Sequence, residues 1–216
     1  MPVRSPRADA TARRILNAAT ACFADRGFEG TTTRAIATRA EVTQPLVLHY
    51  YGSKQGLFDA VMERYIDEYI EAQSAQWSRD TGDIAFFTEG LAVLFAWMGA
   101  DPQRTRLLRW ARLEGRIQPT KAMIDLGATV TARFEAAQRH GILRADVPTW
   151  LAQMVIDATI SGYWERREEY CQRSPDLEPE FDARFLAVTM PMMIDTFFTP
   201  KAAAKARAEL ARTTRA

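Results

Sequence analysis

Apolar residues recur at steps of three and four along almost the whole chain of 216 residues, while the alternating pattern of β-strands is scarce. This spacing puts apolar side chains on one face of a helix, so the sequence predicts an all-α fold. Glycine, proline and short polar runs divide the pattern into successive helices. In the later part of the chain, helices are expected at residues 84–99, 103–116, 120–140, 148–171 and 180–198.

The first 54 residues contain two short helices in close succession. One is expected at residues 34–40. The next begins after Thr43, whose hydroxyl can cap it, with Pro45 in its first turn, where no amide partner is needed. Ser53 can cap a long helix that follows. Two short helices joined by a turn of three or four residues have the geometry of a helix-turn-helix, whose second helix enters the major groove of DNA.

The second of these helices, residues 44–51, would meet base edges with the side chains at its start. The Gln44 amide can both donate and accept hydrogen bonds, as adenine and guanine edges require, whereas Pro45 and Leu46 suit a thymine methyl group. Residues at the starts of the neighbouring helices would bind the DNA backbone, helped by helix dipoles. The expected DNA contacts are Thr33, Arg34, Thr43, Gln44, Pro45, Leu46, Leu48, His49, Tyr50 and Lys54.

The net charge of +1 hides an uneven distribution along the chain. Residues 1–54 carry eight basic and four acidic groups, and residues 200–216 carry five basic and one acidic group, so each segment has a net charge of +4. The segment between them has a net charge of −7. A basic head on an acidic body favours a polyanionic partner for the head.

No segment of the sequence predicts a membrane partner or export from the cell. The uncharged stretch at residues 90–100 is too short to span a bilayer, and the basic N-terminus lacks the apolar core of a secretory signal. We therefore expect a cytoplasmic protein.

The helices at residues 148–171 and 180–198 are apolar on more than one face. A helix with two apolar faces must be buried twice, and a two-fold symmetric homodimer would bury the second face. The alternative is a central helix of a monomer. The expected interface residues are Trp150, Met154, Val155, Ala158, Phe185, Met192, Met193 and Phe197.

The body is rich in aromatic and methionine residues, most of which are expected to form its core. Helical bundles also place ligand pockets between their helices, and such pockets are mainly apolar. We therefore expect a pocket for a small apolar or aromatic effector. Its expected lining is drawn from Phe95, Met98, Trp110, Met123, Gly127, Val130 and Ile160.

Residues for catalysis or metal binding do not gather in any known motif. The two histidines lie far from a plausible nucleophile, and no glycine-rich phosphate loop is present. Cys22 and Cys171 are far apart and form no C-x-x-C pattern, so neither a disulfide framework nor a zinc site is predicted. The sequence thus predicts no enzyme, no cofactor and no metal.

The head contains ACFADRGFEGTT followed by RAIATRAEVTQPLVLHYYGSKQGLFDAV. Through these residues it resembles, over residues 10–62, the TetR-type (tetracycline-repressor-like) family of transcriptional regulators. It implies about nine helices, a three-helix DNA-binding head, and a body that binds an effector and dimerises through its last two long helices. Two positions depart from the family pattern: Glu41 replaces a turn glycine, and Leu48 replaces a tyrosine that contacts the DNA backbone.

Together these features predict three parts: a helix-turn-helix domain at residues 1–54, a helical effector-binding and dimerisation domain at 55–199, and a basic tail at 200–216 that is frayed or projecting. The expected function is repression from a palindromic operator, relieved when the effector shifts the dimer to a different spacing of its recognition helices. The helix at residues 54–79 would transmit this change. The alternatives are an activator of the same family and a helical adaptor that binds protein.

Overall fold

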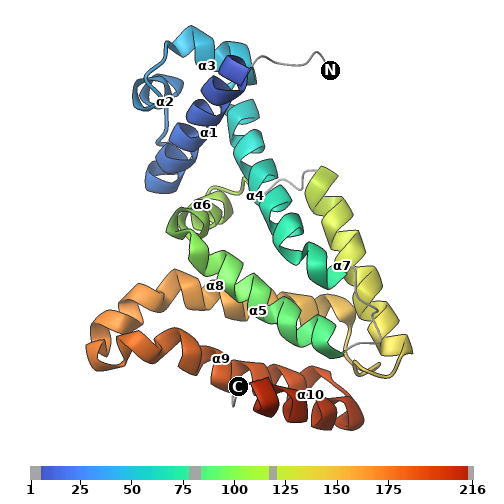
Figure 1. The fold of residues 1–216 in the computed structure, drawn as a ribbon. Helices are drawn as coiled ribbons and strands as arrows, with labels where there is room; N and C mark the ends of the chain where they lie inside the picture. The colour runs from blue at the N-terminus through green and yellow to red at the C-terminus, as the bar shows by residue number, and fades with distance from the viewer. Residues whose placement is uncertain (1–5, 78–83, 117–120, 214–216) are drawn as a thin grey trace. The chain divides into compact units, whose positions relative to one another are not determined.

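The computed structural model describes residues 6–77, 84–116 and 121–213, and within these ranges the chain is helical, with no β-strand (Figure 1). The all-α prediction is confirmed. The helices are α1 (Pro6–Arg26), α2 (Thr33–Arg39), α3 (Gln44–Tyr51), α4 (Lys54–Trp77), α5 (Ile84–Ala100), α6 (Pro102–Leu113), α7 (Lys121–Arg139), α8 (Thr149–Arg173), the 3-10 segment η1 (Pro175–Glu180), α9 (Phe181–Phe197) and α10 (Pro200–Thr213).

Helix bounds follow from local sequence signals. Asp101 caps α6 by accepting a hydrogen bond from the Gln103 amide at 2.9 Å, and Pro102 occupies the first helical position. The side chain of Ser53 accepts from the Gly56 amide at the start of α4, as expected. The end of the predicted 54–79 helix lies outside the described residues.

The chain divides into two compact units. The first contains the described residues up to Glu68 together with Asp101–Ile124, and the second contains Tyr69–Ala100 and the described residues from Asp125 onward. The sequence-based boundary at residue 54 therefore differs from this division, because the first half of α4 and all of α6 pack with the DNA-binding head.

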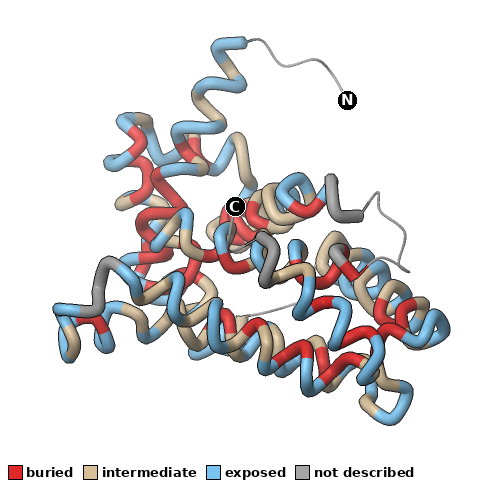
Figure 2. The backbone as a smooth tube through the Cα atoms, turned by 60° about the horizontal axis from the view of Figure 1, so that its bottom comes forward, coloured by how far each residue is buried: buried red, intermediate tan, exposed pale blue. Residues whose placement is uncertain are grey.

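The core of the first unit is built around three phenylalanine rings. Phe58 lies edge-on to both Phe23 and Phe28, with ring centroids 5.2 and 5.4 Å apart. Ile36 from α2 and Val47 from α3 complete this core, with at most 1% of either residue exposed. In Figure 2 the buried residues recur along each helix between exposed ones, as amphipathic helices require.

The second unit has its own core, which draws on α5, α7, α8, α9 and α10. Ile194 is fully buried there, and Phe87 makes edge contacts with Phe134 and Phe198. Helix α9 continues through Pro191. The prediction of a frayed tail is wrong over residues 200–213, because Ala202, Ala203 and Ala206 of α10 are buried in this core.

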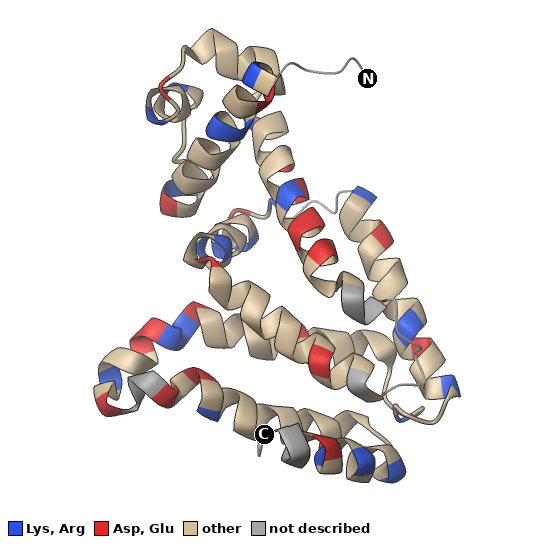
Figure 3. Cartoon of the chain, viewed as in Figure 1, with Lys and Arg blue, Asp and Glu red and all other residues tan. Residues whose placement is uncertain are grey.

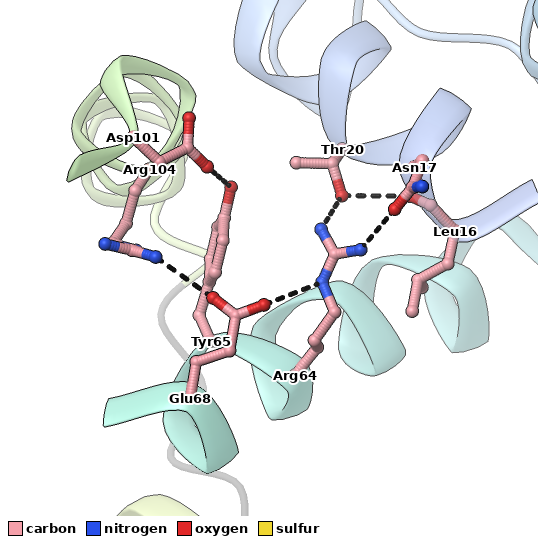
Figure 4. A network of polar contacts seen from close by, with 8 residues as sticks. All are labelled: Leu16, Asn17, Thr20, Arg64, Tyr65, Glu68, Asp101 and Arg104. Carbon is pink, nitrogen blue, oxygen red and sulfur yellow. Dashed lines mark hydrogen bonds and ion pairs between the residues drawn. The ribbon is translucent and has the colours of Figure 1, made fainter. Parts of the chain in front are cut away.

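A polar network in the first unit joins α1, α4 and the start of α6 (Figure 4). Arg64 on α4 donates to the Asn17 side chain at 2.7 Å and to the Thr20 hydroxyl at 2.6 Å, both on α1. Its guanidinium also pairs with Glu68 at 3.6 Å. The second oxygen of Glu68 accepts from Arg104 on α6 at 3.0 Å.

The same network fixes the start of α6 through Tyr65. The hydroxyl of Tyr65 donates to the carboxylate of Asp101 at 3.2 Å. Burial and the nearby Asp101 charge raise the pKa of Tyr65, so the phenol stays protonated and remains a donor at all physiological pH values. The first residues of α6 are thereby held against α4 by hydrogen bonds at both Tyr65 and Glu68.

Candidate nucleic-acid interface

Helices α2 and α3 and the turn between them form a helix-turn-helix. The hydroxyl of Thr32 caps α2 by accepting from the Ala35 amide at 3.1 Å. In the turn, the Val42 amide donates to Ala37 at 3.0 Å, which closes the end of α2. The turn is therefore short and fully determined by backbone hydrogen bonds, as the motif requires.

Glu41 in this turn adopts a left-handed conformation, with φ of 53°. It is the only non-glycine residue with a positive φ in the part of the chain that the structure describes. The sequence singled out this position because a glycine is usual there in the family. A side chain in this conformation costs about 1 kcal/mol, and the Glu41 carboxylate is exposed on the motif.

Helix α3 is attached to the head by few side chains. Val47 is its one buried residue, with 1% exposure. The Tyr51 hydroxyl donates to the Ala12 carbonyl of α1 at 2.9 Å, and Gly52 ends the helix with φ of 73°. An eight-residue helix held in this way leaves most of its surface outside the core.

The predicted base-reading residues lie on this outer surface. Gln44, Pro45, Leu48 and His49 are exposed, whereas Leu46 and Tyr50 are half-buried. The Gln44 amide nitrogen donates to the Thr33 hydroxyl at 2.9 Å, so the first residue of α3 is tied to the first residue of α2.

Thr43 occupies the N-cap position of α3, but its side chain makes no capping hydrogen bond. The expectation that its hydroxyl caps the helix is therefore not met. The Thr43 side chain is exposed beside Gln44 on the same surface.

Helix α3 contains no lysine, arginine, aspartate or glutamate, as Figure 3 shows, so positive charge near it comes from neighbouring elements. Arg34 at the start of α2 is exposed. Arg39 at its end pairs with Asp25 at 3.2 Å. Contacts of arginine and lysine with phosphates would thus come from the elements that flank α3.

Lys54, predicted to bind phosphate, makes several contacts within the head. Its ammonium group donates to the carbonyls of Phe28 and Thr31 at 2.9 and 3.0 Å and lies 4.2 Å from the centroid of the Phe28 ring. An ammonium group has three N–H donors, so at most one remains for DNA.

The turn between α1 and α2 also receives contacts from the end of α6, which sequence analysis did not foresee. The carboxylate of Glu114 accepts from the backbone amides of Phe28 at 2.8 Å and Glu29 at 3.1 Å. Arg116 pairs with the Glu29 carboxylate and donates to the Gln55 side chain at 3.2 Å. These contacts join residues 61 to 87 positions apart, for which no sequence signal exists.

The residues predicted to line the effector pocket are divided between the two units. Phe95, Met98 and Ile160 are buried in the second unit, and half-buried Val130 packs against its core. Gly127 is exposed. Trp110 and Met123 belong to the first unit, where Trp110 packs beside Gly27.

One small cavity lies in the second unit, lined by Phe134, Gln138, Leu143, Arg144, Val147, Thr149, Ala152 and Phe197. Its volume is about 10 Å³, which is enough for one water molecule and too little for an effector.

An aromatic cluster surrounds Phe95 in the second unit. Its ring contacts those of Tyr163, Trp164 and Phe185, with centroids 4.8 to 5.5 Å apart. Trp164 also donates to the Phe95 carbonyl at 3.0 Å. Asp182 adds a polar edge, since it accepts hydrogen bonds from both Tyr163 and Arg167.

The predicted dimer residues fall into two groups. Trp150, Met154, Val155, Ala158 and Met192 are exposed. Met193 and Phe197 are buried in the core of the second unit, and half-buried Phe185 belongs to the aromatic cluster. Val188, which the prediction omitted, has 67% exposure and lies one helical turn before Met192 on α9.

Two other kinds of site can be assessed over the described residues. In residues 6–77, 84–116 and 121–213, no group of three or more His, Cys, Asp or Glu side chains could hold a metal ion. In the same ranges, no helix has the length and apolarity needed to cross a membrane.

Comparison with known proteins identifies the head and then the whole chain. The family model described as "Bacterial regulatory proteins, tetR family" matches residues 15–61. The HTH-type transcriptional regulator RutR of Escherichia coli O157:H7 is 30% identical over 182 residues, which cover 81% of this chain and 80% of RutR. The chain belongs to the tetR family of bacterial regulators.

Other members of the tetR family match over comparable lengths. The HTH-type transcriptional repressor NicS of Pseudomonas putida is 26% identical over 172 residues, covering 76% of this chain and 81% of NicS. The fold matches that of SmeT from Stenotrophomonas maltophilia, solved as a complex with triclosan, with a TM-score of 0.62 and 19% identity over 89% of this chain and 94% of SmeT. Members of the tetR family are DNA-binding transcriptional regulators and not enzymes, and this chain is one of them.

Proposed function

We propose that the protein is a cytoplasmic repressor that binds a palindromic operator as a homodimer and is released from it by a small apolar or aromatic effector. Each subunit would place α3 in the major groove. The observation that carries this proposal is the exposure of helix α3. One residue of the helix is buried, whereas Gln44, Pro45, Leu48 and His49 are exposed.

The roles of these side chains follow from their chemistry. Gln44 at the start of α3 would read a base edge with its amide, and exposed Pro45 and half-buried Leu46 would contact thymine methyl groups. His49, Tyr50 and Arg34 would bind phosphates on either side of the groove. Thr33 shares a hydrogen bond with Gln44 and would hold that amide at the angle at which it meets the base.

The homodimer would form through the exposed apolar residues of α8 and α9. Trp150 and Met154 lie one helical turn apart on α8, with 63% and 54% exposure. Val188 and Met192 repeat this spacing on α9, with 67% and 56% exposure. Large apolar side chains exposed at four-residue spacing on two helices of one unit support a helix-to-helix interface with a second copy.

The effector would bind in the second unit, near the aromatic cluster of Phe95 with Met98 and Ile160. Aromatic side chains beside a few oriented polar groups, here Tyr163 and Asp182, suit a small apolar or aromatic molecule with one hydrogen-bonding group. SmeT, which has a similar fold, was solved in complex with triclosan, and this complex supports a small-molecule effector. Binding would favour a dimer whose α3 helices no longer match two successive major grooves, about 34–36 Å apart.

Titration of the full-length protein against DNA from upstream of its own gene, followed by fluorescence anisotropy at several salt concentrations, tests this proposal. We expect tight, salt-dependent binding to a palindromic site, and a loss of preference over random DNA in the Gln44→Ala, Tyr50→Ala double variant. Glu63→Gln, an exposed change on α4, serves as the control. If a selection from genomic DNA yields no sequence that binds better than random DNA, the proposal is wrong.

A further inference from the structure

The turn between α1 and α2, residues 27–31, is held in place by charged groups from two later helices. Lys54 of α4 donates to the Phe28 and Thr31 carbonyls, and Glu114 accepts from the Phe28 and Glu29 amides. Four backbone groups of this short segment, two amides and two carbonyls, are thus bound by side chains from outside it. We name this group of contacts, made by Lys54, Glu114 and Arg116 to residues 27–31, the turn clamp.

Arg116 strengthens the clamp from a second direction. Its guanidinium carbon lies 3.7 Å from the centroid of the Phe28 ring, and one nitrogen pairs with the Glu29 carboxylate. The Arg116 charge lowers the pKa of Glu29 through this hydrogen bond, so the pair remains charged. Its other terminal nitrogen reaches Gln55 on α4. One side chain therefore contacts the turn, the core ring below it and the first turn of α4.

Glu114 and Arg116 are themselves fixed by the way α6 ends. Gly115 adopts φ of 62°, its amide donates to the Arg112 carbonyl at 3.1 Å, and the Arg116 amide donates to the Ala111 carbonyl at 2.8 Å. This pair of hydrogen bonds is a Schellman motif. The start of α6 is held by the Tyr65 and Glu68 contacts of Figure 4, so both ends of the helix are anchored in the first unit.

The clamp connects to the proposed base-reading residue through a short series of contacts. The clamped turn leads directly into Thr32, the cap of α2, and Thr33, whose hydroxyl accepts from Gln44. Val47 is the one buried anchor of α3, so the orientation of Gln44 depends on this contact with α2. A displacement of residues 27–31 would therefore be passed to the first residue of α3.

We propose that Glu114 and Arg116 are positioning residues for DNA recognition, which act by holding the turn at residues 27–31 and, through Thr33, the side chain of Gln44. This inference rests on the proposed contact of Gln44 with bases. It assigns a part in recognition to α6, which lies outside the segment 15–61 that the family model matches. Neither residue touches DNA in this proposal.

The test compares two clamp variants with two matched controls in the full-length protein. Glu114→Gln and Arg116→Gln each remove one charge from the clamp. Glu63→Gln and Arg106→Gln make the same chemical changes at exposed positions of the same unit. Affinity for the operator and for random duplex DNA is measured over a salt series, at a temperature where circular dichroism shows every variant to be folded.

We expect each clamp variant to lose operator affinity by roughly tenfold, since a hydrogen bond to a charged group is removed. Affinity for random DNA should change less than about threefold, and the salt dependence should match that of the wild type because no phosphate contact is lost. The controls should behave as the wild type. Unchanged operator affinity in both clamp variants, or an equal loss in the controls, would overturn the proposal.

Two further measurements separate positioning from other roles. In a Gln44→Ala background, Glu114→Gln should have little further effect on operator affinity, because both changes act through the same side chain. Additive effects contradict the proposal. For Arg116→Gln, a salt slope that falls by about one with equal losses on both DNAs would identify a direct phosphate contact instead.

Hydrogen exchange of the free protein tests the clamp without DNA. The amides of Phe28 and Glu29 should exchange faster in Glu114→Gln than in Glu63→Gln, and unchanged rates would contradict the clamp itself. A wild-type protein with no operator preference would contradict the proposed function. A wild-type preference that both clamp variants retain would contradict only this inference.

Discussion

The molecule has two exposed surfaces of opposite chemistry, one on α3 and one on α8 and α9. The α3 surface presents polar Gln44 and His49 beside apolar Pro45 and Leu48, and helix α3 is held by one buried valine and by hydrogen bonds at its ends. The α8 and α9 surface presents Trp150, Met154, Val188 and Met192 on long helices whose other faces are buried. The first surface suits a hydrated polyanion, and the second suits an apolar partner such as a second copy of the chain.

The largest expected effect comes from placing a charge on the apolar surface. Met154→Asp should raise the dissociation constant of the proposed dimer at least about 100-fold, because the interface would bury an unpaired carboxylate. Sedimentation equilibrium measures this change. Gln172→Asp, an exposed change near the end of α8, should leave the dimer intact. A Met154→Asp protein that remains dimeric would assign the interface to another surface.

A change in the clamped turn should give the next largest effect. At Gly27, φ is 71° and an added Cβ would lie 2.5 Å from a Glu114 oxygen and 2.9 Å from the Trp110 ring. Gly27→Ala should therefore lower the free energy of unfolding by about 2–3 kcal/mol, from backbone strain and overpacking together. Urea denaturation measures this loss.

Gly52 offers a matched control in the same unit. Its φ is 73°, but no atom lies within 4 Å of an added Cβ. Gly52→Ala should cost only about 1 kcal/mol, which is the backbone contribution alone. Equal losses at the two positions would show that the added Cβ at Gly27 is accommodated by Glu114 and Trp110 without overpacking.

A change in the helix-turn-helix should have a smaller and opposite effect. Glu41→Gly should raise the free energy of unfolding by up to about 1 kcal/mol, because glycine adopts a positive φ without strain. It should also raise DNA affinity at low salt, since a carboxylate near phosphates is removed. Glu41→Gln separates the two causes. It should reproduce the gain in affinity and leave stability unchanged, and a gain in stability would contradict the backbone explanation.

The smallest expected effect concerns acid stability of the second unit. Burial favours a higher pKa for Asp182, but hydrogen bonds from Arg167 and Tyr163 outweigh it and lower the pKa below its usual value. The contribution to stability is therefore present above about pH 4, the usual carboxyl pKa, and is lost as the pH falls through the lowered value.

Thermal unfolding of Asp182→Asn between pH 6 and pH 3 checks this sign. The variant should be slightly less stable than the wild type at pH 6, and the difference should shrink below about pH 4. Asp176→Asn, at an exposed position in η1, should show no difference at any pH. A gap between wild type and Asp182→Asn that widens in acid would mean that the pKa of Asp182 is raised instead.

The sequence predicted the local elements of the fold well, both in the helix-turn-helix and in the body. The helix-turn-helix follows from local signals, including the Thr32 cap, Pro45 in the first turn and the replaced glycine at Glu41, and its elements lie where they were expected. Helices predicted from periodicity in the body agree with the structure to within about three residues. Local spacing and capping determine both results, so a single sequence contains the necessary information.

Long-range packing was not predictable in the same way. Trp110 and Met123 were grouped with Phe95 because all three belong to the aromatic and methionine residues in which the body is rich, but which unit each helix joins depends on contacts far apart in sequence. The alanines of α10 give too weak an apolar signal to reveal that they are buried. The contacts of Glu114 and Arg116 with residues 28 and 29 were missed because a charged pair at a helix end is usually solvated.

The construction of the first unit from two separate stretches of chain has a practical consequence for protein engineering. A hybrid regulator can be made by joining the DNA-binding segment of one protein to the sensor segment of another at a single crossover. A crossover in α4 of this protein would transfer residues 27–31 without Glu114 and Arg116. A hybrid that also carries residues 101–116 should keep its operator preference, whereas a single-crossover hybrid should bind DNA with reduced selectivity.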